Sequence, residues 1–188
     1  MPVKPFFLDL TDNEIDDIQK KTGEILKSGQ LILGKYTKEF ESLFAEYNKT
    51  DYAVSLNSGT SALEILLDFH KVRNKKIAVP SNTNFATVAA ILRTGGIPVF
   101  IDMDPDYFSP NLEMVKEIMS KEPDIIGFVW VHIGGIIHPE FIDVSEYCRI
   151  NGIFLIEDCA HAHGSKFKGV FAGNFADGGA YSFFPTKV

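Results

Sequence analysis

The sequence predicts an α/β fold with a doubly wound, mostly parallel sheet and helices on both faces. From about residue 50 onward, short runs rich in β-branched residues alternate with longer stretches that have helical spacing. Most of the short runs are apolar on both faces, as strands must be in a parallel sheet that helices cover. Regular alternation of strands and helices along a chain is typical of a doubly wound layer.

Six segments are expected to form strands, and four are expected to form helices between them. The expected strands are Tyr52–Leu56, Lys76–Val79, Pro98–Asp102, Asp124–Val131, Gly152–Glu157 and Gly179–Phe184. The expected helices are Ser61–Val72, Phe85–Thr94, Asn111–Ser120 and Pro139–Ile150. Turn and cap residues support these limits, because Ser109-Pro110-Asn111 signals a helix entry and Gly95-Gly96 a helix end.

The first fifty residues have a different pattern and are expected to lie outside the sheet. Asp12–Ser28 and Lys38–Tyr47 have the spacing of amphipathic helices, joined by residues 29–34. We therefore expect an N-terminal helical segment over residues 1–50 and a large domain over residues 51–188. The last expected strand is followed by no helix that could cover it. We expect the natural protein to continue, or a second chain to complete this domain.

Composition argues against several classes of function. The chain has 188 residues, a net charge of −7 and no long cluster of Lys and Arg, so no nucleic-acid partner is expected. No apolar stretch reaches the ~18 residues of a membrane span, and the start lacks the apolar run of a signal peptide. Cys148 and Cys159 fit no metal spacing and are interpreted as reduced thiols. We expect a cytoplasmic protein without a metal site.

A small polar turn follows the first expected strand, within Ser55–Leu63. Backbone N–H groups at a helix N-terminus, with hydroxyl groups beside them, form an anion site. Gly59 would let the backbone approach a ligand closely. Taken alone, the same residues also fit an ordinary helix cap with a tight turn.

A second candidate feature is the apolar segment Ile153–Ile156, which ends in the two acids Glu157 and Asp158. Ligands of doubly wound folds bind at the carboxyl edge of the sheet, where this segment would end. Side chains alternate along a strand, so only one of the two acids points into such a site. That carboxylate could pair with a pyridinium nitrogen and keep the ring protonated. The alternative is a solvated loop acid.

The third candidate feature is Lys187, which follows a strand and several aromatic residues. Loss of water around an amine favours its neutral form, which is the form that makes a Schiff base. Ser182 could donate a hydrogen bond to a phosphate. An exposed lysine after a strand is the alternative. The order of the three features matches a cofactor with a phosphate, a ring nitrogen and an aldehyde, which is pyridoxal 5'-phosphate (PLP).

In these segments the chain resembles the DegT/DnrJ/StrS family of sugar aminotransferases, which are PLP enzymes of the aspartate-aminotransferase fold (fold type I). The likeness covers essentially the whole chain in register, and jointly its motifs are highly specific. The family's chains are longer and add a small C-terminal domain, so the resemblance implies an N-terminal part of such an enzyme. Five stretches carry it: Ser28–Gly34 with Glu39–Glu41, Asn57–Leu63, Pro80–Thr83 with Ala86–Thr87, Val131–His132 with Gly135, and Glu157–Gly164 with Ser182–Lys187.

The resemblance implies roles for individual residues. Lys187 is expected to form the Schiff base with PLP and to move protons, and Asp158 is expected to pair with the pyridine nitrogen. His161 stands where the family usually has Gln, near the phenolic oxygen of the cofactor. Asn84 stands where the family often has an aromatic residue stacked on the cofactor ring. The phosphate is expected to bind a cup made by Gly59, Thr60, Ser61 and Ser182.

The resemblance also implies an activity. An amino acid, by family analogy glutamate, would give its amino group to a nucleotide-linked keto-sugar, in cell-surface polysaccharide (lipopolysaccharide) or amino-sugar biosynthesis. The full-length protein would be a homodimer. One alternative is a sugar dehydratase of the same fold, although those enzymes replace the lysine by His and Lys187 argues against it. The other alternative is an inactive truncated or regulatory remnant.

Overall fold

The computed structural model describes residues 9–187. By its internal contacts the chain divides into two compact units, Met1–Ser55 and Leu56–Val188. The expected domain limits at residues 50 and 51 stay a prediction. In the described part of the chain, no helix has both the length and the apolar character needed to cross a membrane.

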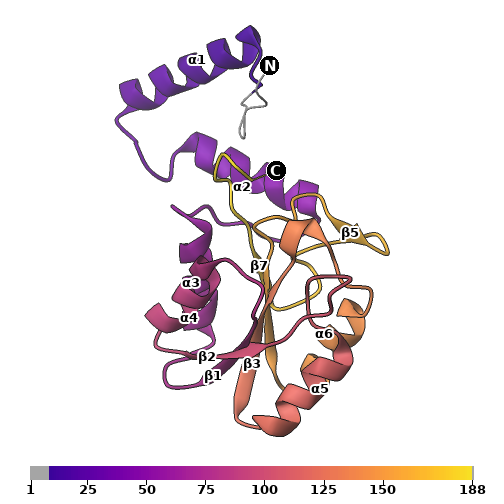
Figure 1. Ribbon diagram of the computed structural model, residues 1–188. Coiled ribbons are helices and arrows are strands. Elements are labelled where there is room, and N and C mark those ends of the chain that lie inside the picture. The colour runs from indigo at the N-terminus through magenta and orange to yellow at the C-terminus, as the bar shows by residue number, and fades with distance from the viewer. Residues whose placement is uncertain (1–8, 188) are drawn as a thin grey trace, which may run out of the picture. The chain divides into compact units, whose positions relative to one another are not determined.

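The second unit is built on a five-stranded sheet in the order β2-β1-β3-β4-β7 (Figure 1). Every neighbouring pair in it is parallel, so all the carboxyl ends of the strands lie at one edge. The predicted α/β fold with a parallel sheet is therefore confirmed. Its strands are β1 (Lys76–Pro80), β2 (Ile97–Ile101), β3 (Ile125–Val131), β4 (Phe154–Asp158) and β7 (Gly178–Ala180).

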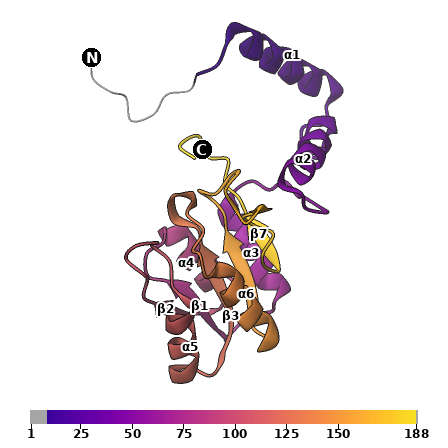
Figure 2. The same cartoon turned by 90° about the vertical axis from the view of Figure 1, so that its right-hand side faces the viewer.

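Helices cover both faces of this sheet. On one face lie α3 (Gly59–Phe69) and α4 (Phe85–Arg93), and on the other lie α5 (Leu112–Lys121) and α6 (Phe141–Ile150) (Figure 1). Figure 2 shows the same unit turned by 90°, with α5 and α6 toward the viewer. Because side chains alternate along each strand, β3 and β4 contribute to two separate cores. Val129 and Ile156 join the core on the α3–α4 face, while the neighbouring Trp130 and Leu155 join the core on the α5–α6 face.

Short polar side chains determine where three of these helices begin. The Ser58 hydroxyl accepts from the backbone N–H of Ser61 at 3.1 Å, so α3 starts at Gly59, two residues earlier than expected. Asn84 caps α4 and Asn111 caps α5 in the same way. The caps of α3 and α4 lie at the carboxyl edge of the sheet, because each of these helices runs from that edge toward the opposite one.

Two of the six strand predictions need correction. Tyr52–Leu56 is not a strand, and Tyr52 and Val54 are 86% and 76% exposed. Among the described residues no strand pairs with this segment, and a strand needs a partner for its backbone N–H and C=O groups. The last strand, β7, ends at Ala180 instead of Phe184. Its one neighbour among the described strands, β4, ends at Asp158 opposite Ala180, so the residues after Ala180 have no strand there to pair with.

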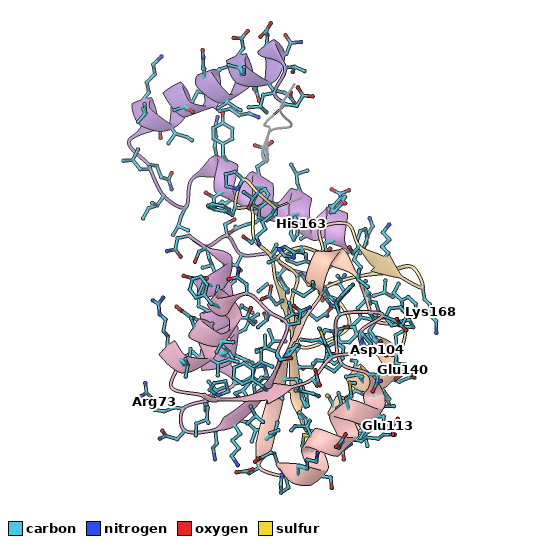
Figure 3. The ribbon with its side chains drawn as sticks, viewed as in Figure 1. Arg73, Asp104, Glu113, Glu140, His163 and Lys168 are labelled. Carbon is cyan, nitrogen blue, oxygen red and sulfur yellow. The ribbon has the colours of Figure 1, made fainter. Side chains whose placement is uncertain are left out.

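The sequence reading missed a small hairpin between β4 and β7. It consists of β5 (Lys166–Phe167) and β6 (Val170–Phe171), which pair antiparallel. Its two turn residues, Lys168 and Gly169, have φ angles of 49° and 85°, the left-handed pair that suits a two-residue hairpin loop. Lys168 is labelled in Figure 3. The Lys-Gly pair is the signal that could have revealed the hairpin, but two-residue strands are too short to recognise by periodicity.

From residue 9 onward, the first unit contains two helices, α1 (Asp12–Ser28) and α2 (Lys35–Asn48). A capping box between Thr11 and Glu14 starts α1, and Gly29, with φ of 69°, ends it. The Glu24 carboxylate accepts from Lys35 Nζ and from the Tyr36 hydroxyl, both at 2.6 Å, and so connects α1 to α2. The limits predicted for α1 are those observed, while α2 begins three residues earlier than the expected Lys38.

Candidate active site

The candidate residues lie in the second unit at the carboxyl edge of the sheet. Figure 3 shows His163, which follows β4, at one end of the unit, and Arg73, which precedes β1, toward the other. Asp158 is the last residue of β4, and its register partner Ala180 is the last residue of β7. The segments that follow these two strands are therefore adjacent when they leave the sheet.

The N-terminus of α3 packs closely against the segment after β7. A Cβ atom added to Gly59 would lie 3.1 Å from the carbonyl oxygen of Tyr181 and 3.2 Å from Ser182 Cβ. Glycine therefore allows the first turn of α3 to approach Ser182 more closely than another residue would. Thr60 and Ser61 lie in the same turn, where backbone N–H groups have no acceptor within the helix. N–H groups and hydroxyls gathered at a helix N-terminus suit an anion such as phosphate.

Asp158 is buried on the α3–α4 face of the sheet. Its two oxygens accept from the hydroxyl of Thr87, at 2.8 Å, and from the backbone N–H of Ala160, at 3.1 Å. Thr87 in turn contacts the hydroxyl of Thr83 at 2.8 Å. Burial raises the pKa of the Asp158 carboxyl above its usual range, although these hydrogen bonds and the nearby His132 and His161 oppose that shift. No cation pairs with Asp158 in the part of the chain that the structure describes.

Glu157 points to the opposite face, and its carboxylate accepts hydrogen bonds from three donors. The donors are His132 Nε2 at 2.9 Å, the backbone N–H of Gly173 at 2.7 Å and that of Phe175 at 2.8 Å. Because a carboxylate only accepts, His132 carries its proton on Nε2. Glu157 therefore anchors the loop before β7 from inside the protein.

His132, Glu157 and Cys159 are also close enough to be considered as metal ligands. One potential ligand atom from each lies within 4.8 Å of the others, and all three residues are buried. We assign no metal to this cluster, because the oxygens of Glu157 already accept three hydrogen bonds. Burial, followed by the charges of the two neighbouring acids, raises the pKa of the Cys159 thiol well above its usual range, which opposes formation of the thiolate that a metal needs.

Lys187 meets His161 beyond the ends of β4 and β7. Lys187 Nζ lies 2.8 Å from His161 Nε2, and the backbone N–H of Gly134 donates to His161 Nδ1 at 3.3 Å. His161 follows Asp158 by three residues, within the turn that ends β4. His163 lies beside this pair, with both ring nitrogens buried and without a hydrogen-bond partner. Burial lowers the pKa of His163, and the charges of His161 and Lys187 lower it further.

Asn84 is the candidate residue with the simplest structural role. Its side-chain oxygen accepts from the backbone N–H of Ala86 at 3.0 Å and caps α4. The neighbouring Phe85 is 81% exposed, so its ring is free of other side chains on most of its surface. Neither observation tests whether Asn84 binds a cofactor, so that role stays a prediction.

The structure thus brings the candidates together in three groups, Gly59 with Ser182, Asp158 with Thr87, and Lys187 with His161. Sequence reasoning gave no separate role to Thr83, Thr87 or Gly134, although the resemblance included Thr83 and Thr87. The visible signal was their place in a stretch that carries the resemblance, since Thr83 precedes the cap of α4 and its contact with Thr87 depends on the turn between them. The contact of Gly134 with His161 had no signal, since it is made by a backbone N–H.

Comparison with known proteins identifies the family. A sequence model of the DegT/DnrJ/EryC1/StrS aminotransferase family matches residues 12–188. The chain belongs to this family. Over 181 residues it is 33% identical to the dTDP-3-amino-3,4,6-trideoxy-alpha-D-glucose transaminase of Micromonospora megalomicea subsp. nigra, covering 94% of this chain and 47% of that one. It is 35% identical over 157 residues to the GDP-perosamine synthase of Escherichia coli O157:H7, covering 82% and 42%.

Solved structures agree with this assignment. The PLP form of a Streptococcus pneumoniae protein assigned as a sugar aminotransferase superposes with a TM-score of 0.83 at 29% identity. The match covers 95% of this chain and 48% of that chain. The present aminotransferase-family chain therefore spans about half the length of the relatives that it matches.

The site residues of this family member fit PLP. The turn at Gly59 and Ser182 offers backbone N–H groups and hydroxyls for a phosphate. Asp158 is a buried carboxyl that pairs with no cation among the described residues, and a protonated ring nitrogen would neutralise its negative charge. Lys187 offers a primary amine beside an imidazole. A phosphate, a ring nitrogen and an aldehyde are the three groups through which PLP binds proteins.

Proposed function

We propose that, within the complete protein, this chain binds PLP and transfers an amino group from an amino acid, by family analogy glutamate, to a nucleotide-linked keto-sugar. The observation that supports this most directly is the contact of Lys187 Nζ with His161, in a turn only three residues beyond the buried Asp158. When bound, PLP supplies an aldehyde that links reversibly to amines and a ring that accepts electrons from neighbouring bonds. The relatives' nucleotide-sugar names support the substrate class.

Lys187 would hold the cofactor and move protons. Its Nζ is the primary amine of this site, and the half-buried position limits competition from water. After the amino donor displaces it from the cofactor, the free Nζ would take a proton from the donor's α-carbon. In the second half of the reaction it would return a proton to the sugar carbon that receives nitrogen.

Asp158 would keep the ring nitrogen protonated. Its carboxylate is buried, and a positive partner there would relieve the cost of burying a negative charge. Thr87 and the N–H of Ala160 hold the two carboxylate oxygens in place. The first turn of α3, with Ser182, would orient the cofactor through its phosphate.

The proposal is tested by following the cofactor with light absorption. PLP added to the complete protein should produce a visible band that borohydride bleaches, and peptide mass spectrometry should find the reduced cofactor on Lys187. Lys187→Ala should show neither result, while Lys168→Ala, a change in the exposed hairpin turn, should show both. A protein without a band, or with label spread over surface lysines, would contradict the proposal.

The reaction type is tested separately. Glutamate should remove the band and release its keto acid, and a nucleotide-linked keto-sugar should then restore the band and carry the nitrogen. A sugar dehydratase would instead remove water from the sugar. It would do so without consuming glutamate as an amino donor. Loss of water from the sugar with no transfer of nitrogen would therefore favour the dehydratase reading.

A further inference from the structure

Two threonine hydroxyls lead to the Asp158 carboxylate from outside the strand that carries it. The hydroxyl of Thr87 donates to Asp158 Oδ2 at 2.8 Å, and Thr83 Oγ1 lies 2.8 Å from Thr87 Oγ1. The two threonines belong to the segment that follows β1, while Asp158 ends β4. Because β3 lies between β1 and β4 in the sheet, this pair connects the ends of strands that are not neighbours.

The hydroxyl of Thr87 does not make the contact that is usual for a threonine in a helix. Such a hydroxyl commonly donates back to the carbonyl oxygen three or four residues earlier. Thr94, which ends α4, does so, since its hydroxyl lies 2.9 Å from the carbonyl oxygens of both Ala90 and Ile91. Thr87 lies in the first turn of the same helix and is buried, yet its hydroxyl donates to Asp158. An additional contact must favour this direction.

The contact with Thr83 supplies that preference when Asp158 is ionised. A carboxylate only accepts, so the single hydroxyl proton of Thr87 goes to Asp158. Thr87 then has only lone pairs for its contact with Thr83, and Thr83 is the donor there. A hydroxyl that accepts one hydrogen bond is polarised and donates the next one more strongly. Thr83 therefore strengthens a hydrogen bond that it does not itself make.

From this arrangement we infer that Thr83 is a positioning residue for the candidate cofactor site, acting on Asp158 through the hydroxyl of Thr87. Its proton occupies a lone pair of Thr87 and keeps that hydroxyl directed at Oδ2 instead of back along the helix. Oδ1 is held separately by the backbone N–H of Ala160, at 3.1 Å. The carboxylate is thus fixed at both oxygens, and each oxygen keeps a second lone pair for another donor.

The same pair of hydroxyls also serves the protonated form of Asp158. A proton on Oδ2 would be donated to Thr87, and the proton of Thr87 would turn toward Thr83. Because only hydroxyl protons rotate, no heavy atom has to move between the two forms. The carboxyl group can therefore gain or lose a proton while its position is held.

Other groups around Asp158 also act on its charge. Burial raises the pKa of the carboxyl, while hydrogen bonds and the nearby His132 and His161 lower it. The thiol of Cys159 lies near the same carboxyl, but burial raises its own pKa well above the usual range and keeps it neutral. Within α4, Arg93 at the opposite end is the one ionisable side chain. The charges of these groups stay the same when a hydroxyl before α4 is removed.

The inference rests on the proposed function for its purpose, because a carboxylate held in place is what a protonated ring nitrogen requires. The effect of Thr83 is nevertheless a property of Asp158 itself. It can be measured in the cofactor-free protein, where a failure of the proposed function cannot hide it.

A double-mutant cycle in the cofactor-free protein tests this role of Thr83. The carboxyl ¹³C signal of Asp158, identified by its loss in Asp158→Asn, is followed against pH. Thr83→Val should raise the pKa of Asp158, because hydrogen bonds that end on a charge are stronger than those between neutral groups. Thr87→Val should raise that pKa further than Thr83→Val does. In a protein that already carries Thr87→Val, adding Thr83→Val should leave the titration unchanged.

Two variants serve as matched controls. Thr83→Ser keeps the hydroxyl and should titrate like wild type, whereas a role of the Thr83 methyl group in packing would make it resemble Thr83→Val. Thr94→Val removes a hydroxyl from the other end of the same helix and should also titrate like wild type. Equal titrations for wild type and Thr83→Val would overturn the inference. So would an effect of Thr83→Val that persists in full when the Thr87 hydroxyl is absent.

Thermal unfolding shows which variants are folded. If a variant without the Thr87 hydroxyl does not fold, the comparison of Thr83→Val with Thr83→Ser and wild type decides alone. Absence of the PLP band in wild type would contradict the proposed function, while the titrations would still decide the role of Thr83. A normal band together with an unshifted titration in Thr83→Val would overturn the inference and leave the proposed function in place.

Discussion

Glu157 and Asp158 are neighbours at the end of β4, yet they lie in contrasting surroundings. Glu157, on the α5–α6 face, is fully buried and accepts hydrogen bonds from His132 and from two backbone N–H groups. Asp158, on the α3–α4 face, is almost as buried but accepts from one hydroxyl and one N–H. The first carboxylate is saturated by the protein, and the second retains capacity for another donor.

This difference separates a structural acid from a candidate functional one. A buried carboxylate with three donors is compensated inside the fold and stabilises the loop that provides them. A buried carboxylate with fewer donors costs stability, and such a cost is commonly found at binding sites. The following predictions test that comparison, in order of decreasing effect.

Glu157→Ala should cause the largest loss of stability. It removes the acceptor of three hydrogen bonds and leaves unpaired the buried His132 and two partly buried backbone N–H groups, so we expect a loss of about 3 kcal/mol in the free energy of unfolding. Urea denaturation measures this change. Glu157→Gln, which keeps one acceptor oxygen, should lose less, and equal losses in both variants would refute the three-donor account.

Thr87→Val should lower the free energy of unfolding by less, about 1.5 kcal/mol. It removes one hydroxyl, which lies between Thr83 and the Asp158 carboxylate. Since the Thr87 hydrogen bond lowers the pKa of Asp158, its loss should move that pKa further upward. Carboxyl ¹³C resonances followed against pH measure the shift. Thr87→Ser retains the hydroxyl and should leave the titration near that of wild type.

Asp158→Asn should stabilise the cofactor-free protein at neutral pH. Because burial raises the pKa of Asp158 above its ordinary value of 3.8, the folded state keeps a proton that the unfolded chain releases, and stability falls as the pH rises through this window. Asparagine does not ionise, so its stability does not change in this way. The gain in the free energy of unfolding of Asp158→Asn over wild type should therefore be greatest near pH 7 and vanish near pH 4. Urea denaturation at both pH values measures it. An advantage that does not change with pH would contradict this account.

The smallest effect is expected for the two cysteines. Burial raises the pKa of Cys148 to about 12 and that of Cys159 well above its usual range. Neither thiol should react with a thiol reagent at pH 8 until the protein is denatured. Rapid labelling of Cys159 in native protein would show that the core beside the two acids is open to solvent.

Much of the fold could be predicted from the sequence. Apolar runs, caps and glycines located the helices to within three residues and four of the six expected strands to within two, because these signals are local. The strand predicted at Tyr52–Leu56 was wrong because a strand needs a neighbouring strand to pair with, and the local sequence does not show whether one is present. The strand β7 was shorter than expected for the same reason. At the site, the alternation rule correctly put Glu157 and Asp158 on opposite faces.

The sequence by itself determined the α/β class, the family resemblance and the residue types available for chemistry, since these follow from local pattern and motif order. Only the tertiary structure decided which partner each residue has. Thr87 reaches Asp158 from a helix 71 positions away, and the Gly134 N–H reaches His161 from another strand end. Such contacts depend on how parallel strands bring distant segments to one edge of the sheet. A backbone N–H donor also cannot be recognised from the sequence, because every residue except proline has one.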